Sequence, residues 1–139
     1  MGNRAVITFA PYKKSNVGIY LHWNGGRASV EGFLQACKEL GYRTPGSDST
    51  YSMARLIGVI GVFLGGSLSV GAGTCSTLDC DNGDNGLYVI GGDWEIVGRE
   101  YIRPGFREEE NPEKTRQIVD QCKLKIAAAE AASISEQAA

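Results

Sequence analysis

Short runs of apolar and polar residues along the chain predict two β-hairpins. Residues 4–10 are rich in β-branched and aromatic side chains, and residues 17–23 alternate between apolar and polar positions. The polar turn between these runs favours antiparallel pairing. Residues 87–90 and 94–101 flank a glycine-rich turn and are the second predicted hairpin. A short strand is also expected at 68–70.

Apolar residues spaced three and four positions apart predict two helices, and Asn111 as an N-cap before Pro112 predicts a third. The first has Ser29 as its N-cap and Gly41 at its C-terminal end, with an apolar stripe between them. The second covers about 51–64, and the third covers about 112–130, with a proline at its first position.

Two glycines inside the second predicted helix need a reason, because each costs about 1 kcal/mol of helix stability relative to alanine. Gly58 and Gly61 therefore predict close packing against another backbone.

Hairpins and helices that do not alternate as β-α-β units indicate an α+β fold, with a largely antiparallel sheet built from hairpins and packed with about three helices. We expect a single α+β domain over residues 1–131 and a flexible, alanine-rich tail over 132–139.

The composition is that of one globular domain, with 139 residues, 42% of them hydrophobic and 22% charged. A net charge of −2 and a pI near 5.4 argue against a general binder of nucleic acid or of anionic membranes. The charge is uneven, because residues 1–47 carry six basic and two acidic side chains, whereas the stretch from Asp79 to Glu95 contains five acids and no cation. This asymmetry suggests a basic end and an acidic end, with two ordinary solvated faces as the alternative.

No export signal is apparent at the N-terminus, so we expect a cytoplasmic protein whose four cysteines stay reduced. The uncharged run 56–78 is long enough to span a bilayer, but six glycines and several hydroxyl side chains interrupt it and favour buried elements instead.

A single histidine excludes metal sites with two or three histidine ligands. No metal and no cofactor are expected, and Cys37 and Cys122 are predicted core residues.

The first candidate site is the turn that joins the second predicted strand to the first helix. Glycine N–H groups at a helix N-terminus, with an arginine beside them, suit a phosphate or carboxylate. A tryptophan there can stack on a base, and a histidine can move a proton. The alternative is a tight structural turn with the tryptophan in the core and the histidine facing solvent. The candidate ligand-binding residues are His22, Trp23, Asn24, Gly25, Gly26, Arg27 and Ser29.

This turn resembles the loop of PP-loop ATP pyrophosphatases, in which Ser-Gly-Gly-x-Asp-Ser joins a strand to a helix. Gly25, Gly26 and Ser29 match that pattern, whereas Asn24 and Ala28 replace the first serine and the aspartate. The resemblance covers six residues and implies a nucleotide phosphate as the ligand.

The second candidate site is the acidic loop before the second hairpin. Three carboxylates within six residues can hold Ca²⁺ or Mg²⁺, but the positions of glycine and glutamate do not fit an EF-hand loop. Asn-Gly pairs are also strong turn formers, so a solvent-facing loop and an acidic contact surface are the other two interpretations. The candidate partner-binding residues are Asp79, Asp81, Asn82, Asp84 and Asn85.

Catalysis has little support in the sequence. No Gly-x-Ser-x-Gly elbow occurs, and any nucleophile–histidine pair would need the single His22. We assign no catalytic residue and consider an enzyme less probable than a binding protein. An enzyme that uses His22 together with Asp79 or Asp81 is kept as a third hypothesis.

Three segments, 2–9, 18–26 and 78–86, are together similar to small proteins encoded by bacterial phages, prophages and other mobile elements. The similarity spans roughly residues 2–101. It implies a cytoplasmic protein of an infected bacterial cell and, by analogy, an inhibitor of host defence such as an anti-CRISPR protein.

Two binding hypotheses follow. In the first, the protein blocks a bacterial defence protein by direct contact, with the acidic stretch from Asp79 to Glu95 mimicking nucleic-acid phosphates. In the second, it sequesters a nucleotide messenger at the turn between Trp23 and Ser29, at the interface of a homo-oligomer. Neither hypothesis needs direct contact with nucleic acid or with a membrane.

Overall fold

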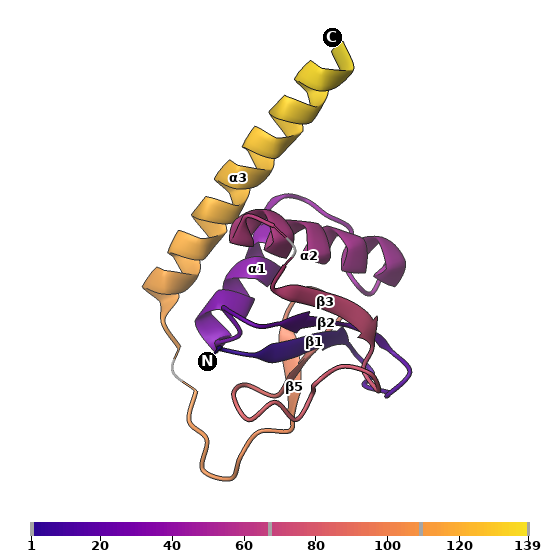
Figure 1. The fold of residues 1–139 in the computed structure, drawn as a ribbon, viewed down its shortest axis with the longest axis vertical. Helices are drawn as coiled ribbons and strands as arrows, with labels where there is room; N and C mark the ends of the chain where they lie inside the picture. Colours follow the sequence, from indigo (N-terminus) through magenta and orange to yellow (C-terminus); the bar gives the residue numbers. More distant parts are fainter. Residues whose placement is uncertain (1, 67, 109, 139) are drawn as a thin grey trace.

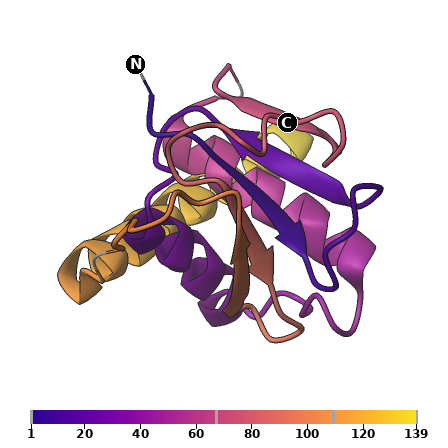
Figure 2. The ribbon, with the colours of Figure 1, turned by 90° about the horizontal axis from the view of Figure 1, so that it is seen from below.

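The structure is a computed structural model that describes residues 2–66, 68–108 and 110–138. A five-stranded sheet carries three helices on one face, which confirms the predicted α+β fold (Figures 1 and 2). The strands are β1 (Ala5–Phe9), β2 (Val17–Leu21), β3 (Val70–Thr74), β4 (Leu87–Ile90) and β5 (Ile96–Glu100). The helices are α1 (Arg27–Glu39), α2 (Ser49–Leu64) and α3 (Pro112–Ala138).

The strand order is β3-β2-β1-β4-β5, so the two predicted hairpins lie side by side in one sheet. Strands β1 and β2 pair antiparallel, as do β2 with β3 and β4 with β5. The junction between the hairpins is parallel, with Ile7 of β1 opposite Tyr88 of β4. Every residue of β1 and β4 is buried, as expected for central strands covered on both faces.

The alternation of side chains in β1 divides the apolar residues into two layers. Ala5, Ile7 and Phe9 face the three helices and belong to the main core. Val6 faces the other side and packs with Leu87, Val89, Cys75 and Cys80, which form a smaller cluster. The loop that leads from β3 to β4 therefore covers the sheet face that has no helix.

Helices α1 and α3 pack in parallel at very short range. Thr115 Oγ1 donates a hydrogen bond to the Ala28 carbonyl oxygen at 3.0 Å, and one turn further along Gly32 lies against Ile118. A Cβ atom on Gly32 would come within 2.6 Å of Ile118 Cγ2, so only glycine fits this contact. Both helices begin at the same end of the molecule as a result (Figure 1).

Some helix boundaries differ from the prediction. The first helix begins at Arg27 with Gly26 as its N-cap, so the prediction of Ser29 as the N-cap is wrong. Ser29 lies within the first turn and is buried, because the chain already turns at the glycine pair. The third helix continues to Ala138 rather than ending near Glu130, since nothing in its alanine-rich sequence breaks it.

Two further expectations also change. The strand predicted at 68–70 lies later in the chain, because β3 starts at Val70 and ends at Thr74. Gly58 and Gly61 do not pack against another element: a Cβ on Gly58 would meet nothing within 4 Å, and one on Gly61 would only approach the Gly66 carbonyl oxygen at 4.0 Å. Their predicted close packing is wrong.

The C-terminal part of α3 extends away from the rest of the molecule (Figure 1). Its last buried side chain is Ile126, and Ile134 is exposed. The expected tail begins within this helical extension, and its last residue, Ala139, is outside the described residues. Cys37 and Cys122 are buried in the core as predicted. Within the described ranges, no helix is both long enough and apolar enough to cross a membrane.

Candidate functional site

The turn between β2 and α1 uses its first glycine for structure. The Gly25 N–H donates to the Asn3 carbonyl oxygen at 2.8 Å, and the Gly25 carbonyl oxygen accepts from the Tyr88 hydroxyl at 2.7 Å. A Cβ at this position would lie 2.4 Å from the Asn3 carbonyl oxygen. The prediction that both glycine N–H groups face a ligand is therefore wrong for Gly25, because its N–H already has an acceptor.

The first turn of α1 is different. Gly26 is the N-cap, and since glycine has no side chain, no side-chain oxygen caps the helix. Among the described residues, no acceptor lies within hydrogen-bond distance of the N–H groups of Arg27, Ala28 and Ser29. These groups carry the positive end of the α1 dipole and are arranged to accept an anion.

A cavity of about 310 Å³ lies over these N–H groups. It is bounded by the first turns of α1 and α3, by the loop between β5 and α3, and by Asn85. We name it the α1–α3 cavity. The residues of its lining that bear on ligand binding are Gly26, Arg27, Ser29, Phe106, Arg107 and Lys114.

The second helix that borders this cavity adds a second positive end. Asn111 Oδ1 accepts a hydrogen bond from the Lys114 N–H at 3.1 Å and caps α3, and both residues line the cavity. The parallel packing of α1 and α3 thus places two helix N-termini at one cavity. Each terminus is equivalent to about half a positive charge, so their effects add.

The half-buried carboxylate of Glu108 pairs with two arginines beside the cavity. Arg27 donates to Glu31 at 2.6 Å and to Glu108 at 2.7 Å. Glu108 also forms an ion pair with Arg99, whose guanidinium lies 3.7 Å from the centre of the Tyr88 ring. Burial lowers the pKa of Arg99, and the nearby Arg27 cation adds to that effect. The two guanidiniums are therefore balanced by the two carboxylates of Glu31 and Glu108.

Two further cations stand at the mouth of the cavity. Arg107 and Lys114 are exposed, and within the described residues neither lies within ion-pair distance of a carboxylate. Of the charged side chains that line the cavity among residues 2–66, 68–108 and 110–138, three are cationic and Glu108 is the one acid. Sequence reasoning missed Arg107 and Lys114, because no local pattern links them to Arg27 some eighty residues earlier.

The remaining residues of the predicted turn site lie outside this lining. Trp23 is 46% exposed, so the alternative that buries it in the core is wrong. The Tyr20 hydroxyl and His22 Nδ1 are 2.9 Å apart, and the His22 ring meets the edge of Trp23 with ring centroids 5.1 Å apart. Asn24 has a positive φ of 60°, and its Nδ2 donates to Ser29 Oγ at 3.4 Å.

The acidic loop is built around a buried asparagine. Asn82 Oδ1 accepts from the N–H groups of Asp84 and Gly86, and Asn82 Nδ2 donates to three carbonyl oxygens of the loop. Asn85 is also buried, and its Nδ2 donates to Asn3 Oδ1 at 2.6 Å and to the Arg4 carbonyl oxygen at 3.0 Å. Both asparagine side chains thus have partners inside the protein.

The carboxylates of the acidic stretch do not form one surface. The Arg4 guanidinium lies 2.8 Å from the Asp84 carboxylate. Hydrogen bonds from this guanidinium and from the Arg4 backbone N–H hold the pKa of Asp84 below its usual value. Asp79 and Asp81 are exposed at this end of β4. Asp93 is at the opposite end of the strand, where it pairs with Lys38 at 3.2 Å. Arg4 also lies 3.7 Å from Asp79, so three of the five acids have a cationic partner inside the protein.

The chemistry of a metal site or of a histidine catalyst has no geometric support in the described residues. No group of three histidine, cysteine, aspartate or glutamate side chains within 2–66, 68–108 and 110–138 is placed to hold a metal ion. His22 has Tyr20 as its hydrogen-bond partner, and no described contact joins it to Asp79 or Asp81.

Comparison with models of protein families, with curated proteins and with solved structures finds no match to this chain.

Proposed function

We propose that the protein binds a small phosphate-bearing molecule in the α1–α3 cavity. The observation that carries this proposal is the convergence of two helix N-termini with Arg27, Arg107 and Lys114 on one cavity. A phosphate accepts hydrogen bonds from the uncapped N–H groups of α1 and balances the charges of Arg107 and Lys114, which have no ion-pair partner among the described residues.

The cavity also has the features that a nucleotide needs. Its volume of about 310 Å³ is at the lower end of the range for small-molecule sites. Phe106 is the aromatic residue of the lining and offers a surface on which a base can stack. We propose a nucleoside phosphate as the ligand class. In the phage context implied by the sequence resemblance, the role would be capture of a nucleotide messenger of bacterial defence.

The test is calorimetric titration of the full-length chain with AMP and with adenosine. AMP should bind and adenosine should not, because the phosphate supplies the contacts with α1. Lys114→Gln should weaken AMP binding about tenfold at low salt, as expected for a lost charge-assisted contact. Lys14→Gln is the matched control, since it removes one lysine charge from a turn that does not line this cavity.

Equal binding of AMP and adenosine would contradict the proposal, as would equal losses in the two lysine variants. The AMP affinity should also fall as salt rises from about 50 to about 300 mM, because the contacts are ionic and partly exposed.

A second candidate function is inhibition of a bacterial defence protein by surface contact. Its support is the exposure of Asp79 and Asp81, although Asp79 already lies 3.7 Å from the Arg4 guanidinium. Replacement of both by asparagine should then weaken capture of that partner from a bacterial lysate and flatten its salt dependence. Unchanged capture by the double variant would exclude this surface.

A further inference from the structure

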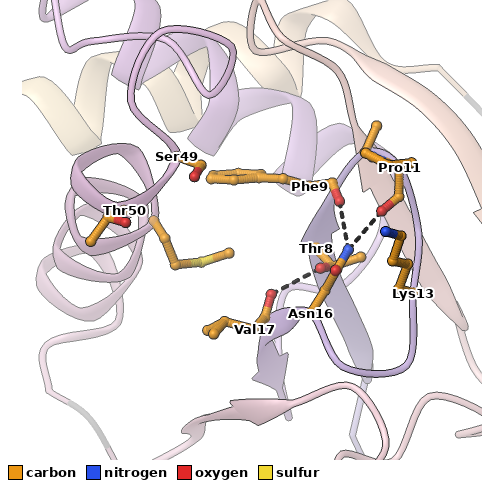
Figure 3. A pocket seen from close by; sticks show the side chains of 10 residues that line it. Thr8, Phe9, Pro11, Lys13, Asn16, Val17, Ser49 and Thr50 are labelled. Atoms are coloured by element: carbon orange, nitrogen blue, oxygen red, sulfur yellow. Dashed lines mark hydrogen bonds between the residues drawn. The ribbon is translucent and has the colours of Figure 1, made fainter.

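A second cavity, of about 410 Å³, lies between the turn that joins β1 to β2 and the first turn of α2 (Figure 3). We name it the hairpin cavity. It shares no lining residue with the α1–α3 cavity. The residues that decide its chemistry are Phe9, Lys13, Val17, Ser49, Thr50 and Met53.

The wall of the hairpin cavity is apolar. The Phe9 ring and the Val17 side chain border the central space (Figure 3), and Met53 also lines it. Phe9 and Met53 are more than nine-tenths buried overall, whereas Val17 is 52% exposed at the open side. The Phe9 ring also packs against Trp94 in a T-shaped arrangement, with ring centroids 6.0 Å apart. An apolar ligand body would therefore displace water from a fixed apolar surface.

Hydrogen bonds fix the hairpin side of the cavity. Asn16 Nδ2 donates to the carbonyl oxygens of Phe9 at 3.0 Å and of Pro11 at 2.8 Å (Figure 3). Thr8 Oγ1 donates to the Val17 carbonyl oxygen at 2.8 Å. These bonds tie the turn to both strands, so the cavity exists before any ligand arrives and little ordering is needed on binding.

The polar groups of the cavity favour one negative charge. Lys13 is the one charged residue among those that line it, and within the described residues it has no carboxylate within ion-pair distance. On the opposite side, the hydroxyl groups of Ser49 and Thr50 belong to the first turn of α2. The nearest acid of that turn, Asp48, is already engaged, because it accepts from the Tyr51 N–H and from Arg43, each at 3.1 Å.

We propose that the hairpin cavity binds an apolar carboxylate, that is, a molecule with a hydrocarbon body and a single anionic head. The body packs on Phe9, Val17 and Met53, and the carboxylate pairs with Lys13. A phosphate-rich ligand does not suit this site, since one ammonium group stands against an apolar wall. The site is thus separate from the proposed phosphate site in place and in ligand chemistry.

The experiment is a titration of the ¹⁵N-labelled full-length chain with sodium octanoate, followed by the shifts of the backbone amide signals. The largest shifts should fall on Val17, Ser49, Thr50 and Met53, and octylammonium at the same concentration should not produce them. Lys13→Gln should weaken octanoate binding about fivefold at low salt, the effect of one ion pair at a partly exposed site. Lys14→Gln, the next residue in the same turn, should leave it within about twofold.

Three results would overturn the proposal. They are the absence of octanoate shifts at these four amides in the wild-type chain, shifts of equal size with octylammonium, and equal affinities in the two lysine variants. The wild-type map stays decisive even if a variant folds poorly, and AMP is not used, so failure here leaves the proposed phosphate site unaffected.

Discussion

Replacement of Gly32 by alanine tests the close contact that sets α1 parallel to α3. The added Cβ would lie 2.6 Å from Ile118 Cγ2 and 2.8 Å from Ile118 Cβ, and 3.3 Å from the Thr115 carbonyl oxygen. Ordinary carbon–carbon contacts are about 3.5–4.0 Å, so the helices must separate by about 1 Å or Ile118 must leave its position. Ile118 is buried, which leaves it little room to move.

The change in the free energy of unfolding caused by Gly32→Ala follows from two opposing effects. Alanine in a helix interior is about 1 kcal/mol more favourable than glycine. Overpacking of a tight core contact costs about 1–3 kcal/mol, and this contact is at the severe end because the clash involves two atoms near the Ile118 backbone. The net expectation for Gly32→Ala is a loss of about 1–2 kcal/mol in the free energy of unfolding.

Urea unfolding followed by circular dichroism measures this loss, which should lower the midpoint by about 0.5–1 M. Gly58→Ala is the matched control, because Gly58 is also helical but a Cβ there would meet nothing within 4 Å. That variant should gain about 0.5–1 kcal/mol from helix propensity alone. If Gly32→Ala proved as stable as Gly58→Ala, the helix contact described here would be wrong.

Three other predictions use the same unfolding assay. Asn82→Ala should lose about 2–4 kcal/mol, because it removes the acceptor and donor that organise the acidic loop, and a loss below about 0.5 kcal/mol would refute that role. Tyr88→Phe should lose about 1–2 kcal/mol, since the buried Gly25 carbonyl oxygen is left without its hydroxyl donor; an unchanged midpoint would argue against that bond. Hydrogen bonds from Arg116 lower the pKa of Glu39 to about 2. Glu39 should therefore stabilise the fold at pH values above its unfolded pKa of about 4.5, and this stabilisation should be lost as the pH falls towards 2. The difference in unfolding free energy between wild type and Glu39→Gln should accordingly narrow between pH 4.5 and pH 2 and stay constant above pH 4.5.

The sequence was sufficient to predict the elements that depend on local periodicity. The two hairpins and the first two helices follow from alternation and from three-and-four spacing, and all four are present. The parallel pairing of β1 with β4 could not be predicted, because it joins residues some eighty positions apart and no turn specifies it. The exact start of α1 also depended on tertiary contacts, since Gly25 is held by Asn3 and Tyr88.

In the candidate site, too, local features could be predicted from the sequence and long-range contacts could not. Gly26, Arg27 and Ser29 were predicted from the glycine turn at a helix N-terminus, and they line the α1–α3 cavity. Arg107 and Lys114 could not be predicted with them, because the parallel packing of α1 and α3 is what brings them close. The sequence also suggested more unpaired carboxylates in the acidic loop than the structure has, because Asp84 pairs with Arg4 in a contact that the sequence does not reveal.

The most direct measurement of the central claim is an amide shift map of the ¹⁵N-labelled chain titrated with AMP. The account predicts that the largest shifts fall on Arg27, Ala28, Ser29 and Lys114, at the two helix N-termini that border the α1–α3 cavity. Shifts confined to the Asp79–Asp84 loop, or no shifts at AMP concentrations up to about 1 mM, which corresponds to a binding free energy of about −4 kcal/mol, would contradict it.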